Sequence, residues 1–191
     1  MAFDEKNSLG FKNDGRLKLL IIVGTRPEII RLSEVIKKCR RHFDCLLAHT
    51  GQNYDYALNE VFFRDLSLDN PDVYLDCAGV DLGESVGNII DRSYKLMAQI
   101  KPDALLVLGD TNSCLSAIPA KRLHIPIFHM EAGNRCKDEC LPEETNRRMM
   151  LFQTLTLPTP SMLAAGLRSR AAHRSAPSSR VVLWLRYSPR T

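Results

Sequence analysis

The chain has 191 residues, which is long enough for one domain with a sizeable hydrophobic core. Hydrophobic residues make up 45% and charged residues 25% of it, as in soluble globular proteins, and no apolar run approaches the roughly 20 residues of a membrane-spanning helix. The net charge of +4 divides into −4 for residues 1–144, which hold all 22 acids, and +8 for the last 47 residues, so the main domain is not predicted to bind nucleic acid.

The N-terminal residues and the cysteines predict a cytoplasmic protein. Residues 1–16 are polar and lack the apolar core of a secretory signal, so they are expected to form a flexible extension. The six cysteines include no Cys-x-x-Cys pair and no accompanying histidine cluster, and the single Cys136-x-x-x-Cys140 spacing is weak support for zinc. Reduced thiols and no metal site are therefore expected.

From residue 17 onward, apolar runs alternate with helical patterns. Strands are predicted at 17–23, 44–49, 72–75, 104–109 and 125–129, and helices near 27–41, 55–65, 82–100 and 112–124. The almost continuous apolar runs 17–23 and 104–109 are typical of strands covered on both faces, and Asp81 with Glu84 predicts a cap at the start of the 82–100 helix. This alternation predicts an α/β domain over residues 17–150, a Rossmann-like parallel sheet with helices on both faces and all strand carboxyl ends along one edge.

Residues 151–191 form a tail rich in Arg, Ser and Pro that is predicted to be disordered. Three interpretations are open: an arginine-rich arm that binds nucleic acid or anionic lipid, a solvated tail, or an out-of-frame translation. We favour the third hypothesis because Asp, Glu and Lys vanish together after Glu144. Reading the DNA downstream of codon 148 in all three frames tests it, and an intact in-frame stop after Thr191 in several isolates would count against it.

A cationic turn follows the first predicted strand. Gly24 permits a turn that other residues resist, Arg26 is suited to a bidentate phosphate contact, and Pro27 fits the first turn of a helix. A phosphate contact at the end of a first strand is one interpretation. The alternative is a capping box formed by Thr25 and Glu28, with Arg26 solvated.

Three carboxylates follow the later elements. Asp110, with Thr111 after it, ends the 104–109 run, Glu131 follows the 125–129 run, and Glu143 begins a later helical pattern. Acids that converge at one sheet edge raise each other's pKa and can serve as general acid and base. The structural alternatives are a helix cap for Asp110, an ion pair with Arg135 for Glu131, and an ordinary acidic helix start for Glu143.

Two further polar residues follow strands. His129 could contact a ligand, although a lone histidine at a strand end is more often hydrogen-bonded within the structure. Gln52 follows the second strand, where turn chemistry explains it fully and a ligand contact is the lesser alternative. The candidate substrate-binding residues are therefore Gly24, Thr25, Arg26, Gln52, Thr111, His129 and Arg135.

These elements, in this order, resemble the non-hydrolysing UDP-N-acetylglucosamine 2-epimerase family. The matching segments are VGTRPEIIRLSEVI (23–36), HTGQNYD (49–55), KPDALLVLGDTNSCLS (101–116), IPIFHMEAGNR (125–135) and LPEETNRR (141–148). Within this family, the residues of these segments look most like those of the UDP-N-acetyl-L-fucosamine synthases, which serve capsule and O-antigen assembly.

The resemblance implies two Rossmann-like domains, as in GT-B glycosyltransferases, with a UDP-sugar in the cleft. Arg26 would face the diphosphate, and Asp110, Glu131 and Glu143 would be the catalytic carboxylates. Gln52 would lie near a second, regulatory UDP-sugar site. The implied reaction removes the C2 proton, eliminates UDP to a glycal-like intermediate, then protonates the opposite face and re-adds UDP. No cofactor or metal is implied, and the full-length protein is expected to be a homodimer.

The family's second domain, which supplies most nucleoside contacts and a catalytic histidine, has no counterpart after Arg148. We therefore expect this chain to be a poor catalyst, because half a cleft cannot exclude water or orient the sugar. Besides the epimerase hypothesis, two alternatives stay open. One is a truncated, inactive module that binds a sugar nucleotide or pairs with subunits, and the other is half of a GT-B glycosyltransferase.

Overall fold

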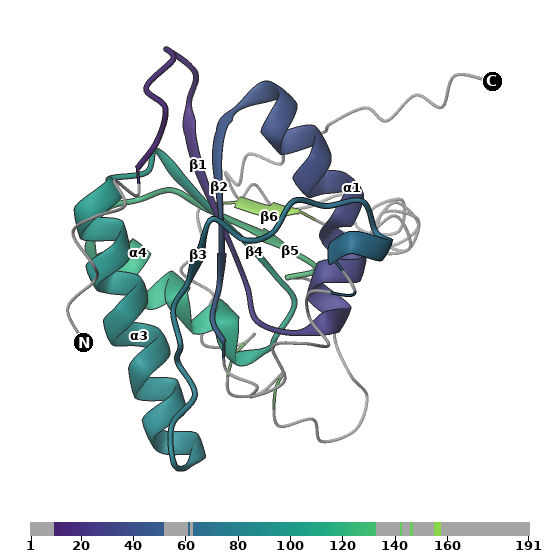
Figure 1. Cartoon of the computed structure of the whole chain (residues 1–191). Helices are drawn as coiled ribbons and strands as arrows, with labels where there is room; N and C mark the ends of the chain where they lie inside the picture. The colour runs from purple at the N-terminus through teal and green to yellow at the C-terminus, as the bar shows by residue number, and fades with distance from the viewer. Residues whose placement is uncertain are drawn as a thin grey trace, which may run out of the picture.

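A computed structural model of the chain describes residues 10–51, 61, 63–132, 142, 146 and the backbone of residues 155–157. Its centre is a six-stranded sheet in the order β3-β2-β1-β4-β5-β6, in which every neighbouring pair is parallel (Figure 1). The strands are β1 (Lys18–Val23), β2 (Asp44–His49), β3 (Val73–Tyr74), β4 (Ala104–Leu108), β5 (Ile127–Met130) and β6 (Leu155–Leu157). The predicted Rossmann-like parallel sheet is confirmed.

Helices connect these strands. Helix α1 (Arg26–His42) joins β1 to β2, and α3 (Leu82–Ile100) joins β3 to β4. A 3-10 helix, η1 (Asn112–Ser116), and the short α4 (Ala117–Arg122) join β4 to β5, where the sequence predicts one continuous helix. The helix predicted near 55–65 falls largely outside the described residues, although 61 and 63–65 are helical.

Both faces of the sheet are covered, as the apolar runs predict. Along β1, Leu20 and Ile22 belong to a core shared with α3 and α4, whereas Ile21 and Val23 belong to a second core under α1. Figure 1 shows α1 on one side of the sheet and α3 with α4 on the other. Alternate residues of a strand point to opposite faces, which is why an unbroken apolar run is needed here.

The start of α3 confirms the predicted cap. Asp81 Oδ1 accepts the backbone N–H of Glu84 at 2.8 Å, and Glu84 Oε2 accepts the N–H of Val80 at 2.7 Å. Both bonds satisfy N–H groups that would otherwise lack partners near the first turn. This connection therefore begins where the sequence predicts.

Residues 10–16 differ from the predicted flexible extension. Phe11 is only 8% exposed and belongs to the core on the α3 side, and the N–H of Asn13 donates to Asp44 Oδ2 at 2.8 Å. Arg16 donates to the carbonyl of Arg41 at the end of α1. A single buried aromatic residue creates no periodicity, so this packing is invisible in the sequence pattern. Residues 1–9 lie outside the described part.

The sheet also extends past the predicted domain end at residue 150. Leu155–Leu157 pairs with Phe128, His129 and Met130 of β5 as the edge strand β6. A three-residue edge strand carries little hydrophobic signal beside the arginine-rich segment that follows it. The rest of the predicted tail lies outside the described residues.

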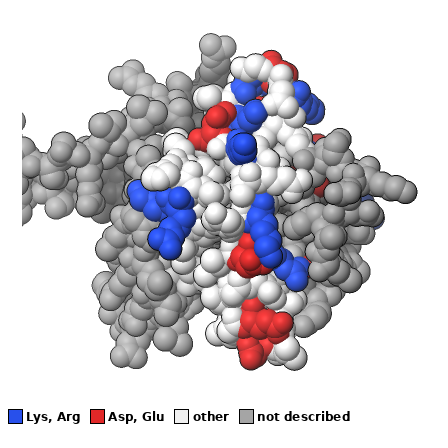
Figure 2. All heavy atoms as spheres, turned by 90° about the vertical axis from the view of Figure 1, so that its left-hand side faces the viewer, with Lys and Arg blue, Asp and Glu red and all other residues white. Residues whose placement is uncertain are grey.

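The surface over α3 and α4 carries both signs of charge. Figure 2 shows basic and acidic side chains interspersed over this face, a pattern typical of a solvated helical layer. Within the part of the chain that the structure describes, no helix is long and apolar enough to cross a membrane.

Candidate functional site

The strand order reverses between β1 and β4, because β2 and β3 lie to one side of β1 whereas β5 and β6 lie beyond β4. Open parallel sheets bind ligands at such a switch point, outside the strand carboxyl ends. Arg26 follows β1, Asp110 follows β4 and Glu131 follows β5, and all three side chains are half-buried. The fold thus brings the predicted cation and two of the predicted acids to the ends of three neighbouring strands.

The turn after β4 depends on Gly109, whose φ is +72°. Its N–H donates to the Met130 carbonyl at 2.9 Å, which ties the end of β4 to the end of β5. The sequence analysis placed the turn that requires glycine at Gly24. The φ of Gly24 is not positive, so that prediction is wrong. Residues with side chains resist this conformation, and Gly109 is therefore the glycine that directs the chain toward Asp110.

His129 contacts the backbone of this turn. Its side chain is fully buried, and Nε2 lies 2.6 Å from the Gly109 carbonyl oxygen. This contact is the structural alternative weighed for a lone histidine at a strand end. Its role as a substrate contact stays a prediction.

Asp110 does not cap the helix that follows it, because the N-cap residue of η1 is Thr111. The Asp110 carbonyl accepts a hydrogen bond from Asn146 Nδ2 at 2.8 Å, and the same amide donates to Asn112 Oδ1 at 3.1 Å. Asn146 is 5% exposed, so this one residue of the LPEETNRR motif packs against the turn after β4. The sequence analysis did not select Asn146, although it lies in the same motif as Glu143.

The turn after β1 differs from the predicted capping box, whereas the phosphate contact of Arg26 stays a prediction. Thr25 is the N-cap residue of α1, and Pro27 lies in the first turn as predicted, but the Thr25 side chain makes no capping bond. Instead, Thr25 Oγ1 donates to Glu28 Oε2 at 2.8 Å, and the Gly24 N–H donates to the same oxygen at 3.0 Å. The capping box is therefore replaced by a buried carboxyl group that accepts from the turn.

Glu28 is the site residue that the sequence analysis missed, since it appeared there only as a partner for a cap. It is 2% exposed, and its Oε1 accepts from Ser113 Oγ at 2.5 Å. Burial raises the pKa of the Glu28 carboxyl above its ordinary value, while the hydrogen bonds from Ser113, Thr25 and Gly24 oppose that shift. A carboxyl group thus lies directly beneath the switch point.

Glu131 pairs with a residue that the sequence analysis did not name. Its Oε2 accepts from Arg31 Nη1 at 2.8 Å, across the sheet edge from α1, whereas the predicted partner Arg135 lies outside the described residues. Glu131 also has a φ of +59°, which a residue with a side chain adopts at a cost of roughly 1–2 kcal/mol. Such strain is found most often at functional sites.

Glu143 and Gln52 also lie outside the residues that the structure describes. Among those it does describe, no group of three or more His, Cys, Asp or Glu side chains could hold a metal ion. No disulfide joins the cysteines that the structure describes, and burial raises the pKa of the Cys45 and Cys77 thiols to about 12. These thiols are therefore protonated at neutral pH.

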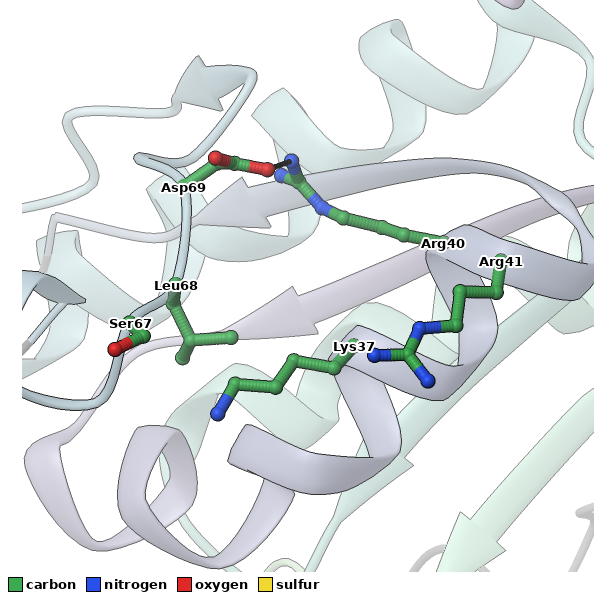
Figure 3. Close-up of a pocket in the computed structure, with 6 residues that line it drawn as sticks. All are labelled: Lys37, Arg40, Arg41, Ser67, Leu68 and Asp69. Atoms are coloured by element: carbon green, nitrogen blue, oxygen red, sulfur yellow. Dashed lines mark hydrogen bonds and ion pairs between the residues drawn. The ribbon is translucent and has the colours of Figure 1, made fainter.

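A hollow of about 380 Å³ lies at the other end of α1 and is lined by Lys37, Arg40, Arg41, Ser67, Leu68 and Asp69 (Figure 3). Its central cation is already engaged, because Arg40 pairs with Asp69 at 2.8 Å and with Asp72 at 3.1 Å. Basic residues in a last helical turn also stabilise the helix dipole. We therefore regard this hollow as a structural feature.

The strand order and the residues at its switch point define a doubly wound α/β domain of the kind that binds nucleotides. Comparison with known proteins agrees. The family model described as UDP-N-acetylglucosamine 2-epimerase matches residues 37–156. The structure of a UDP-N-acetylglucosamine 2-epimerase from Rickettsia bellii is 46% identical with a TM-score of 0.72, and the match covers 82% of this chain and 42% of that one.

Two further epimerases are similar to this chain. A Methanocaldococcus jannaschii UDP-GlcNAc 2-epimerase, solved with UDP-GlcNAc and UDP, is 34% identical with a TM-score of 0.71 over 81% of this chain and 44% of that one. A Pseudomonas aeruginosa UDP-2,3-diacetamido-2,3-dideoxy-D-glucuronate 2-epimerase is 39% identical over 69% of this chain and 38% of its own length.

The chain belongs to the UDP-N-acetylglucosamine 2-epimerase family. It spans less than half the length of these relatives. The prediction of one half of a GT-B-like fold is thereby confirmed.

Proposed function

We propose that this chain is the N-terminal domain of a UDP-sugar 2-epimerase, which inverts C2 of a UDP-N-acetylhexosamine. The observation that carries the proposal is the placement of Arg26, Asp110 and Glu131 at the ends of three neighbouring strands around the switch point. A guanidinium suits a diphosphate, and two carboxylates suit the removal and return of a proton. Membership of the epimerase family supports the same assignment.

The proposed reaction has two stages. A general base removes the C2 proton while the bond from C1 to the UDP oxygen breaks, which leaves bound UDP, detached from the sugar, and a glycal with a C1–C2 double bond. A general acid then protonates C2 from the opposite face, and the UDP oxygen re-forms its bond to C1. Asp110, Glu131 and Glu143 exchange the protons, and Arg26 holds the UDP between the two stages.

The proposed substrate is UDP-GlcNAc, with UDP-ManNAc as product, or the corresponding precursor of UDP-N-acetyl-L-fucosamine. The surrounding pathway is surface polysaccharide synthesis in the cytoplasm, including capsule or O-antigen. A family relative named for a diacetamido-glucuronate substrate supports variation in the sugar. Assaying these UDP-sugars in parallel separates the possibilities.

A second candidate is a non-catalytic module that binds a sugar nucleotide or pairs with subunits. It is favoured by one observation, the match of this chain to less than half the length of its relatives. A coupled assay of C2 inversion by the 191-residue chain decides between the two. Turnover that Asp110→Asn abolishes refutes the module, whereas no turnover together with binding of UDP supports it.

The control for this assay is Asp91→Asn, because Asp91 is an exposed acid of α3 that pairs with Lys95 at 2.7 Å, far along the chain from the candidate site residues. This variant should keep wild-type turnover. Deuterium incorporation at C2 from heavy water, without transfer of sugar to an acceptor, distinguishes epimerisation from glycosyl transfer. Incorporation that Asp110→Asn leaves unchanged would refute the role assigned to Asp110.

We also propose that the full-length protein is a homodimer. Sedimentation of the chain across a range of concentrations tests whether this half contributes to pairing. A sedimentation coefficient that stays at the monomer value at all concentrations would assign any pairing to the rest of the protein.

A further inference from the structure

Glu28 contacts both turns that border the switch point. Its Oε2 accepts the Gly24 N–H at 3.0 Å and the Thr25 hydroxyl at 2.8 Å, both in the turn after β1. Its Oε1 accepts the Ser113 hydroxyl at 2.5 Å, and Ser113 Oγ lies 2.7 Å from Thr111 Oγ1, both in the segment after β4. One carboxyl group therefore joins segments that are 85 residues apart in the sequence.

Among the residues that the structure describes, the ladder between β1 and β4 gives no equivalent link at this level of the sheet. The registered pairs between β1 and β4 end at Ile21 with Leu106, two residues before each strand ends at Val23 and Leu108. Beyond that pair, the ladder between the two strands does not continue toward the turns that carry the candidate site. The hydrogen bonds of Glu28 span the gap where the ladder has stopped.

We propose that Glu28 is a positioning residue whose buried carboxyl group joins the turn that carries Arg26 to the turn that carries Asp110 and so fixes their separation. The proposal rests on the proposed UDP-sugar site. Glu28 itself is 2% exposed, so it acts through the two turns and does not touch the substrate. We call the contacts of Glu28 with Gly24, Thr25 and Ser113 the Glu28 link.

The burial of Glu28 is hard to explain by helix formation alone. An exposed acid in the first turn of α1 would interact with the helix dipole equally well, without loss of hydration. Burying a carboxyl group costs free energy, and only complete hydrogen bonding offsets it. Glu28 meets three donors from two different turns, which is the arrangement that a link between the turns requires.

Two variants separate the link from packing. Glu28→Gln preserves it, because the amide oxygen can accept from Gly24 and Thr25 while the amide nitrogen donates to the Ser113 hydroxyl, which can also accept. Glu28→Leu keeps most of the volume and removes every hydrogen bond. The proposal predicts that Glu28→Gln keeps the wild-type affinity for UDP and that Glu28→Leu does not.

The η1 helix offers a matched pair of serine variants. Ser113 and Ser116 are both fully buried there, but Ser116 Oγ has no hydrogen-bond partner among the described residues, whereas Ser113 donates to Glu28. Ser113→Ala should shift the amide resonance of Gly24, which it reaches through Glu28, and Ser116→Ala should not. In a Glu28→Leu background, the effect of Ser113→Ala on Gly24 should vanish. This readout needs no ligand.

The second readout is the affinity of the 191-residue chain for UDP, measured by titration calorimetry. Misplacing groups by about 1 Å costs up to about a hundredfold in function, so we expect Glu28→Leu and Ser113→Ala to weaken UDP binding by about tenfold or more. Glu28→Gln and Ser116→Ala should stay within about twofold of wild type. If Glu28→Leu does not fold, the two serine variants still decide the question.

Two results would overturn the proposal. One is a Gly24 amide that responds equally to Ser113→Ala and Ser116→Ala, and the other is wild-type UDP affinity in Glu28→Leu or Ser113→Ala. If the wild-type chain binds no UDP, the proposed function fails for this chain. The response of the Gly24 amide to Ser113→Ala then still decides whether Glu28 joins the two turns.

Discussion

His49 should make the folded chain sensitive to mild acid. The ring lies at the end of β2, is 1% exposed, and packs at 5.6 Å from the ring of Tyr74. Its Nδ1 accepts the Gly51 N–H at 3.0 Å, so the neutral ring carries its proton on Nε2. A second proton, on Nδ1, would place a positive charge in the core. It would also replace the acceptor of the Gly51 N–H with a second donor. Burial accordingly lowers the pKa of His49 from 6.5 to about 4.

The sign and size of the effect follow from this pKa. The unfolded chain takes up the proton near pH 6.5 and the folded chain only near pH 4, so the unfolded state binds more protons between these values. Stability is complete above pH 6.5 and falls as the pH falls. The difference amounts to about 2 kcal/mol at pH 5 and about 3 kcal/mol at pH 4.

Urea unfolding of the wild type and of His49→Asn between pH 4 and 7.5 measures this loss. Asparagine can accept the Gly51 N–H through Oδ1 but does not titrate, so shared contributions cancel in the difference between the two proteins. The wild type should lose about 3 kcal/mol relative to the variant across this range. His42→Asn, at the exposed end of α1, controls for the introduction of an asparagine. A difference between wild type and His49→Asn that stays constant with pH would refute the argument.

Three further predictions concern stability. Burial raises the pKa of Glu28 above 4.5, so the folded state keeps this proton to a higher pH than the unfolded chain does. The wild type should therefore lose unfolding free energy relative to Glu28→Gln as the pH rises from about 4.5. Urea titrations at several pH values measure this difference, and a gain of unfolding free energy would contradict the prediction. Gly109→Ala should lower the free energy of thermal unfolding by about 1–2 kcal/mol because the φ of Gly109 is +72°, although the new methyl group meets open space. Gly87→Ala within α3 should instead raise it by about 0.5–1 kcal/mol. Equal effects of the two substitutions would exclude a backbone cause. Glu131→Gly should be about 1 kcal/mol more stable than Glu131→Ala, since both lose the carboxylate but only glycine adopts a φ of +59° freely; equal melting temperatures would argue against strain.

The sheet could be predicted closely where hydrophobic burial alone decides the structure. β1 and β4 lie within one residue of their predicted bounds because every residue of a strand covered on both faces must be apolar. β6 escaped prediction because a three-residue edge strand buries too little to mark the sequence. Phe11 escaped for a similar reason, as one aromatic residue forms no pattern.

The site could be predicted in part. The position of Arg26, Asp110 and Glu131 after three neighbouring strands could be predicted because parallel strands place their carboxyl ends at one edge, a rule that needs no side-chain detail. The partner of each group depends on tertiary packing instead. Glu28 meets Ser113 from 85 residues away, and Arg31 meets Glu131 from 100 residues away, and no local spacing encodes either contact.

Helix α1 carries much of this arrangement by itself. Its first two turns hold Arg26, Glu28 and Arg31, while Ile29 and Leu32 on its inner side are fully buried against the sheet. A core substitution that displaces the helix would therefore move the cation, the Glu28 link and the partner of Glu131 together. Efforts to make this protein more heat-resistant should accordingly start beneath α3, where repacking leaves the geometry of the first two turns of α1 intact.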